Sequence, residues 1–162
     1  MSSPLVNLAL LKKSRRLPQA GDIFVMLPPD GLYLYGRVIS TDADAGFSMP
    51  DNNLIYVYQA RSKEKRSPPE LLPQELLVPP IMTNNLPWTR GYFEFLENRP
   101  LMASDRLPQH SFRDSIRGRY YDEHCNALPG PVEPVGEWGL HSYRTIDDSI
   151  SKALGIPLAP DQ

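Results

Sequence analysis

Apolar and polar residues alternate most regularly between Gly21 and Ser40. The alternation runs through residues 23–27 and resumes in residues 32–40, which indicates two β-strands, because successive strand side chains point to opposite faces. The intervening Pro28-Pro29-Asp30-Gly31 consists of residue types that favour tight turns. The stretch therefore predicts a β-hairpin, with Gly36 at a point where the strand bends or is approached closely.

Three later segments have the character of further strands. Leu54–Tyr58 and Tyr92–Glu97 are rich in aromatic and β-branched residues. Glu75–Met82 is apolar but contains Pro79-Pro80, so a strand here must lie at a sheet edge or be broken by a bend. Three or more antiparallel strands are therefore expected.

The remaining segments are less regular. We expect residues 98–140 to be loops packed over the sheet, with strand candidates at Arg119–Asp122 and, just beyond, Leu140–Arg144. Glu70–Leu72 is a candidate helical turn, because prolines precede it. The apolar residues 5–11 could pair as an edge strand or form helical turns, and seven residues do not decide between them.

The C-terminal region contains the clearest helix signal, over Ile146–Leu154. Thr145 can cap this helix, Asp147 and Asp148 would lie in its first turn, and Gly155 would end it. Its apolar stripe would dock on the sheet.

The 18 prolines among 162 residues argue against a helical bundle and favour short strands joined by loops. We expect an α+β, mainly β fold: a twisted antiparallel sheet or small partly open barrel, with the C-terminal helix packed on it. At this length a single domain is expected, over residues 18–162, preceded by an N-terminal flank at residues 1–17.

The net charge of −2 provides no overall field for nucleic acid or an anionic membrane, so neither is an expected partner. Two basic clusters nevertheless stand out, and each is typical of a solvated loop. The first contains Lys12, Lys13, Arg15 and Arg16, and the second contains Arg61, Lys63, Lys65 and Arg66.

The single cysteine, Cys125, excludes an internal disulfide and fits a reducing compartment. The positive charges follow the apolar residues 5–11, which is the reverse of a secretory signal, and no apolar run approaches the length of a membrane span. We therefore expect a cytoplasmic protein.

Catalytic chemistry has little support in the sequence. The best metal-ligand cluster is Asp122-Glu123-His124-Cys125, but neighbours on an extended segment point in opposite directions, so no metal or other cofactor is expected. Cys125 beside His124 is not an activated nucleophile on that ground alone. The chain also lacks the G-x-S-x-G, G-x-x-x-x-G-K and G-x-G-x-x-G motifs.

Binding chemistry is better represented, because Tyr, Trp and Arg supply most interface energy. Tyr33, Tyr35 and Arg37 share one face of the second hairpin strand, and Trp88 and Trp138 occur in Gly- and Pro-containing segments expected near the surface. These five residues are the candidate partner contacts. The alternative is that such alternating aromatics belong to the core.

Several short motifs together resemble the immunity protein 26 family of bacterial polymorphic toxin systems. They are G-D-I-F followed by G-R-V, Leu54–Tyr58, Pro79-Pro80, Trp88 with G-Y-F-E-F, N-R-P-L from Asn98, the region of Phe112, Y-D-E from Tyr121, W-G-L from Trp138 and I-D-D-S-I-S-K-A-L-G at the C-terminal helix. The resemblance covers residues 17–156. It implies a non-catalytic cytoplasmic protein, a monomer or weak homodimer, that binds and blocks a cognate toxin encoded nearby.

Two alternatives from other classes remain. Some relatives carry a phosphotriesterase label, which would imply a metal-dependent hydrolase, although three scattered histidines make a poor metal centre. A small-barrel adaptor without a toxin partner is the other alternative.

Overall fold

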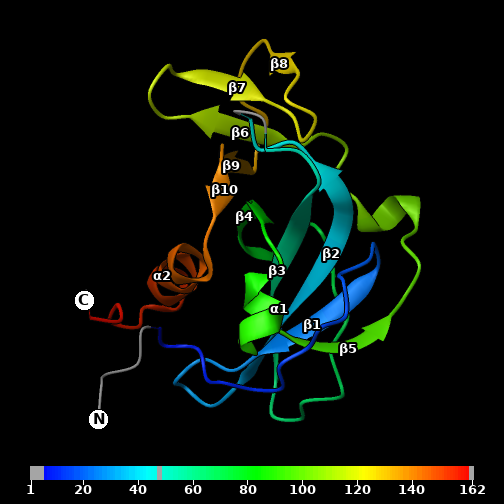
Figure 1. Cartoon of the computed structure of the whole chain (residues 1–162), viewed down its shortest axis with the longest axis vertical. Coiled ribbons are helices and arrows are strands. Elements are labelled where there is room, and N and C mark those ends of the chain that lie inside the picture. The colour runs from blue at the N-terminus through cyan, green and yellow to red at the C-terminus, as the bar shows by residue number, and fades with distance from the viewer. Residues whose placement is uncertain (1–5, 47–48, 161–162) are drawn as a thin grey trace.

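The computed structural model describes residues 6–46 and 49–160, which form two β-sheets flanked by helices (Figure 1). The first sheet has the strand order β10-β4-β3-β2-β1-β5 and the second the order β8-β7-β6-β9. The first contains β1 (Asp22–Met26), β2 (Tyr33–Ala43), β3 (Asn52–Ser62), β4 (Leu76–Thr83), β5 (Glu94–Asn98) and β10 (Leu140–His141). The second contains β6 (Ser111–Asp114), β7 (Arg119–Tyr121), β8 (Ala127–Leu128) and β9 (Val135–Glu137). The helices are α1 (Leu86–Arg90), α2 (Tyr143–Leu154) and the short 3-10 helix η1 (Ala103–Asp105).

The predicted hairpin is present as β1 and β2, which pair antiparallel with Val25 opposite Tyr35. Gly31 has φ +83° and donates its N–H to the Pro28 carbonyl at 3.1 Å, which closes the turn. The close approach expected at Gly36 is confirmed, because the Phe24 ring lies against its backbone where a side chain would stand.

Both faces of the first sheet are buried, because β-strand side chains alternate and each set finds its own cover. On one face Phe24, Val38 and Ile55 pack with Trp88 of α1 and Ile150 of α2. The other face carries the buried side chains Ile23, Val25, Tyr35, Ile39, Tyr56 and Tyr58, which pack with Leu71 and with Phe112 of the second sheet. This explains why all five residues of β1 are buried.

The N-terminal segment, residues 6–20, has no regular secondary structure. It forms neither the edge strand nor the helical turns considered from sequence. Val6 and Leu8 are buried in the core on the face of the first sheet that α1 and α2 cover. The backbone amides of Asn7 and Leu8 donate to the two carboxylate oxygens of Asp147, each at 2.9 Å. A buried carboxylate on α2 therefore holds the start of this segment.

The α+β, mainly β fold with a C-terminal helix packed on a sheet is confirmed. The sheets are mixed rather than purely antiparallel, because β10 pairs parallel with β4 and β9 pairs parallel with β6. The Pro79-Pro80 segment interrupts the register of β4 against β3, as a bend in the strand requires. On its other side β4 pairs with β10 only at Met82 and Thr83, so most of β4 is an outer strand.

Several local predictions were wrong. The helix begins at Tyr143 with Ser142 as its cap rather than Thr145, so Asp147 lies beyond the first turn. Residues 70–72 form no helical turn, and α1 was missed. Residues 98–140 contain the second sheet as well as loops. Its strand β7 confirms the candidate at Arg119–Asp122, but β6, β8 and β9 were missed because strands of two to four residues leave little periodic signal.

The helices that the structure describes are too short or too polar to cross a lipid bilayer.

The contact at Gly36 provides a test of the packing. In Gly36→Ala the new methyl group would meet the Phe24 ring, so we expect a loss of about 1–3 kcal/mol in the free energy of unfolding, measured by urea denaturation. Gly130→Ala is the matched control, because no atom lies within 4 Å of its added Cβ, and it should change stability by less than about 0.5 kcal/mol. Equal stabilities of the two variants would contradict the packing described.

Candidate functional site

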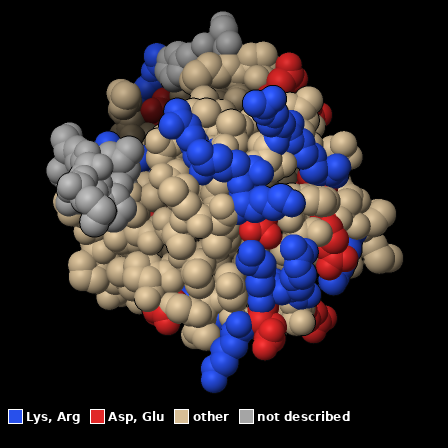
Figure 2. Space-filling model, turned by 60° about the horizontal axis from the view of Figure 1, so that its bottom comes forward, with Lys and Arg blue, Asp and Glu red and all other residues tan. Residues whose placement is uncertain are grey.

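The two basic clusters of the sequence lie side by side in the fold, on the face shown in Figure 2. Their contact is organised by Glu94 of β5, which is only 4% exposed. One oxygen of Glu94 accepts the backbone N–H of Lys12 at 3.2 Å and the Lys65 ammonium at 3.0 Å. The other oxygen lies 3.8 Å from the Arg66 guanidinium. A single buried carboxylate thus joins the N-terminal segment to the loop between β3 and β4.

We define the basic face as the Lys and Arg side chains of the two clusters that meet at Glu94. They are Lys12, Lys13, Arg15, Arg16, Arg61, Lys63, Lys65 and Arg66.

The β3–β4 loop is also supported from below by Tyr35. The Tyr35 hydroxyl donates to the Glu64 carbonyl at 2.6 Å and lies 3.1 Å from the Lys65 carbonyl. Burial raises the pKa of Tyr35, so its hydroxyl remains a donor at neutral pH. The tyrosine ring is buried on the face of the first sheet that packs against the second sheet, and its hydroxyl fixes the β3–β4 loop.

Two arginines of the basic face are fixed by aspartates. Arg16 pairs with buried Asp22 at 3.0 Å and lies over the Phe95 ring, 4.2 Å from its centroid. Arg61 pairs with Asp30 of the hairpin turn at 2.6 Å, and this hydrogen bond holds the pKa of Asp30 below its usual value. These contacts hold Arg16 against β1 and the edge strand β5, and Arg61 against the turn between β1 and β2.

The five predicted partner contacts do not form one cluster. Tyr33 is half-buried beside the basic face, where its carbonyl accepts from Arg61, and Tyr35 lies beneath that face. Trp88 was expected near the surface, but it is 3% exposed and packs against Phe24 and Phe93, so that expectation was wrong.

Arg37 and Trp138 lie elsewhere. Arg37 is 5% exposed, donates to the Arg99 carbonyl at 2.6 Å and pairs with Asp105 at 3.4 Å, so it ties the segment after β5 to β2. Trp138 is half-buried at the second sheet and stacks on Tyr121, with ring centroids 4.6 Å apart.

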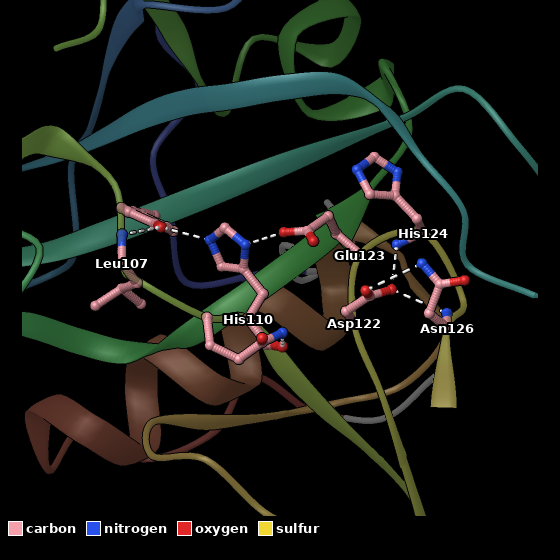
Figure 3. A network of polar contacts seen from close by, with 8 residues as sticks. Leu107, His110, Asp122, Glu123, His124 and Asn126 are labelled. Carbon is pink, nitrogen blue, oxygen red and sulfur yellow. Dashed lines mark hydrogen bonds and ion pairs between the residues drawn. The ribbon is translucent and has the colours of Figure 1, made fainter. Parts of the chain in front are cut away.

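A second polar cluster lies between the two sheets and consists of Tyr56, His110 and Glu123 (Figure 3). The Tyr56 hydroxyl lies 2.5 Å from His110 Nε2 and accepts the backbone N–H of Leu107 at 3.0 Å. The other ring nitrogen, Nδ1, contacts the Glu123 carboxylate. His110 and Glu123 line a cavity of about 610 Å³.

This cluster has the properties of a structural network. Both ring nitrogens of His110 are occupied, and burial raises the pKa of Tyr56 to about 12, so the phenol is protonated at neutral pH. Burial acts to raise the pKa of Glu123, but the hydrogen bond and charge of His110 outweigh it and the pKa is lowered. The network joins β3 to the segments around Leu107 and Glu123.

Cys125, Asp122 and His124, which the sequence offered as candidate metal ligands, add no reactive group to this cluster. Burial, and then the nearby Asp44 and Asp122, raise the pKa of the Cys125 thiol, which disfavours the reactive thiolate. Asp122 instead accepts the backbone N–H groups of His124 and Asn126 and closes their turn. Across residues 6–46 and 49–160, no group of three or more His, Cys, Asp and Glu side chains is placed to hold a metal ion.

Sequence reasoning missed Glu94, which organises the basic face. Residues 92–97 were predicted as a strand, in which a carboxylate is expected on a solvent-facing side, whereas Glu94 is buried under the N-terminal segment. The only available signal was a carboxylate flanked by Phe93 and Phe95.

A family model described as Immunity protein 26 matches residues 19–122, well over half of the chain. The match spans β1 through β7, including the hairpin, the β3–β4 loop and Glu94. No curated protein and no solved structure matches the chain significantly.

The polar cluster predicts a pH-dependent difference between two variants. Because the pKa of Glu123 is lower in the folded state, its ionised form contributes stability above the ordinary value of 4.5, and this is lost as the pH falls through the lowered pKa. Glu123→Gln should therefore cost about 1–2 kcal/mol at pH 7 and progressively less below pH 4.5 in urea denaturation. The exposed Glu70→Gln is the control and should remain within about 0.5 kcal/mol of the wild type throughout. A cost of Glu123→Gln that is independent of pH would contradict the network.

Proposed function

Because the chain belongs to the immunity protein 26 family, we propose that it binds and neutralises a cognate toxin, encoded beside its own gene, without chemistry of its own. The observation that carries this proposal is the family match over residues 19–122. The toxin would be met in the cytoplasm of the producing cell, and one copy of the chain would suffice for binding.

The polar chemistry of the described residues supports binding rather than turnover. The His110 cluster is closed by its own hydrogen bonds, and the hydroxyl of Tyr35 and the carboxylate of Glu94 fix a surface loop. A loop that is already ordered loses less conformational entropy when a partner binds, which favours tight inhibition.

Of the five candidate contacts, Tyr33 and Trp138 have exposed surface with which to meet a toxin. We propose Tyr33 as the first contact to test because it borders the basic face. Tyr35, Arg37 and Trp88 are buried, so their contribution would be to the fold that presents the contacts.

Expression of the toxin domain encoded by the adjacent open reading frame, with and without this protein, tests the proposal directly. We expect restored growth and a complex that co-purifies with a dissociation constant in the nanomolar range or below. A toxic neighbour that is neither bound nor neutralised would refute the proposal. Near-stoichiometric metal in the purified protein, with chelator-sensitive phosphotriester turnover, would instead establish the hydrolase alternative.

Two substitutions should separate contact from core. Trp88→Ala removes a ring that is 3% exposed, so we expect unfolding to become easier by about 3–5 kcal/mol, measured by urea denaturation. Tyr33→Ala should keep a cooperative transition near that of the wild type and weaken toxin binding, measured by calorimetry. If Tyr33→Ala left the affinity unchanged, Tyr33 would not be a contact.

A further inference from the structure

We propose that the basic face is the surface that docks the toxin and that the toxin presents an acidic patch to it. This inference rests on the proposed function and specifies which face binds and the charge of its partner. It starts from the concentration of charge: eight of the chain's seventeen Lys and Arg residues belong to this face, although the net charge is −2 (Figure 2). Nearly half of the cations thus belong to two segments that meet on one region of a mildly acidic molecule.

Half of these cations are free to meet a partner. The side chains of Lys12, Lys13, Arg15 and Lys63 are exposed, and none of them forms an ion pair with any residue that the structure describes. Exposed charges of this kind contribute little to folding, and they would gain from an acidic partner.

The other four cations are held by carboxylates, most of which are themselves buried. Glu94 and Asp22 are 4% and 1% exposed, so they neutralise charge beneath the surface and present little negative charge to a partner. The Glu94 contacts also hold the N-terminal segment at Lys12 next to the loop at Lys65 and Arg66, although the two segments are far apart in sequence. The face is therefore a preorganised surface rather than two independent loops.

The surrounding charge favours a protein partner over a nucleic acid. Nucleic-acid-binding domains are commonly basic overall, with pI above about 9, whereas this chain has a pI of about 5.9. The acidic Glu64 and Asp30 stand among the cations, and both carry exposed surface. A mixed pattern of this kind complements the discrete acidic side chains of a protein better than a continuous phosphate backbone.

Charge complementarity across this face would act mainly on the rate of association, because it steers the encounter before contact. The association rate should therefore fall as the salt concentration rises, since exposed charges are screened at higher ionic strength.

The test is a triple charge reversal, Lys13→Glu, Arg15→Glu and Lys63→Glu, in the full chain. Binding to the toxin domain from the adjacent open reading frame is measured by surface plasmon resonance between about 50 and 500 mM salt, where the Debye length changes several-fold. We expect association at least about 10-fold slower at low salt, with a flatter salt dependence. The matched control reverses Arg113, Arg117 and Arg119 of the second sheet, which are also exposed, and should leave binding unchanged. Circular dichroism melts establish that both variants remain folded.

Each outcome bears on the proposal. If the wild type binds the toxin and the basic-face reversal binds it equally fast, this inference is overturned while the immunity function stands. If the wild type itself does not bind the toxin, the proposed function fails and the inference with it. If the basic-face reversal unfolds, the neutralising set Lys13→Gln, Arg15→Gln and Lys63→Gln replaces it, with a smaller decrease expected. Wild-type binding to a duplex oligonucleotide at physiological salt, lost in the reversal, would identify the face as a nucleic-acid site and overturn the proposal.

Discussion

The arrangement of the surface depends on one kind of interaction. Buried carboxylates accept hydrogen bonds from the N-terminal segment and hold it in place. Asp147 of α2 receives the amides of Asn7 and Leu8, Glu94 of β5 receives the amide of Lys12, and Asp22 receives Arg16. Burying a carboxylate is costly unless hydrogen bonds compensate for the lost water. Here backbone amides and cations supply that compensation, and in doing so they fix an otherwise irregular segment against α2, β5 and β1.

The fixed segment gives the molecule one face that differs from the rest. Its cations join those of the β3–β4 loop only because Glu94 lies between them and Tyr35 supports the loop from inside. The hairpin supplies Tyr35, and its turn supplies the Asp30 that holds Arg61. The scaffold and the proposed docking surface therefore share residues. Substitutions within the hairpin that disturb the core should also displace the loop.

Local patterns were enough to predict the hairpin, β3 and the C-terminal helix, because alternation, turn residues and capping signals act over a few residues. In the second sheet only β7 was predicted in this way, since Phe112 and Gly136 pair across a long connection in strands of four and three residues. The same limit applied to the candidate site. Residues 12–16 and 61–66 each looked like a solvated loop, and nothing in the sequence indicated that the buried Glu94 would bridge them. Trp88 shows the converse, since Pro and Gly neighbours suggested exposure but α1 turns its ring into the core.

The most direct test of the central claim is hydrogen–deuterium exchange of the protein alone and in complex with the toxin domain encoded beside it. The account predicts slower exchange on binding in peptides covering residues 12–16 and 61–66, with unchanged exchange in residues 113–119 of the second sheet. Protection confined to the second sheet, with unchanged exchange across the basic face, would contradict it.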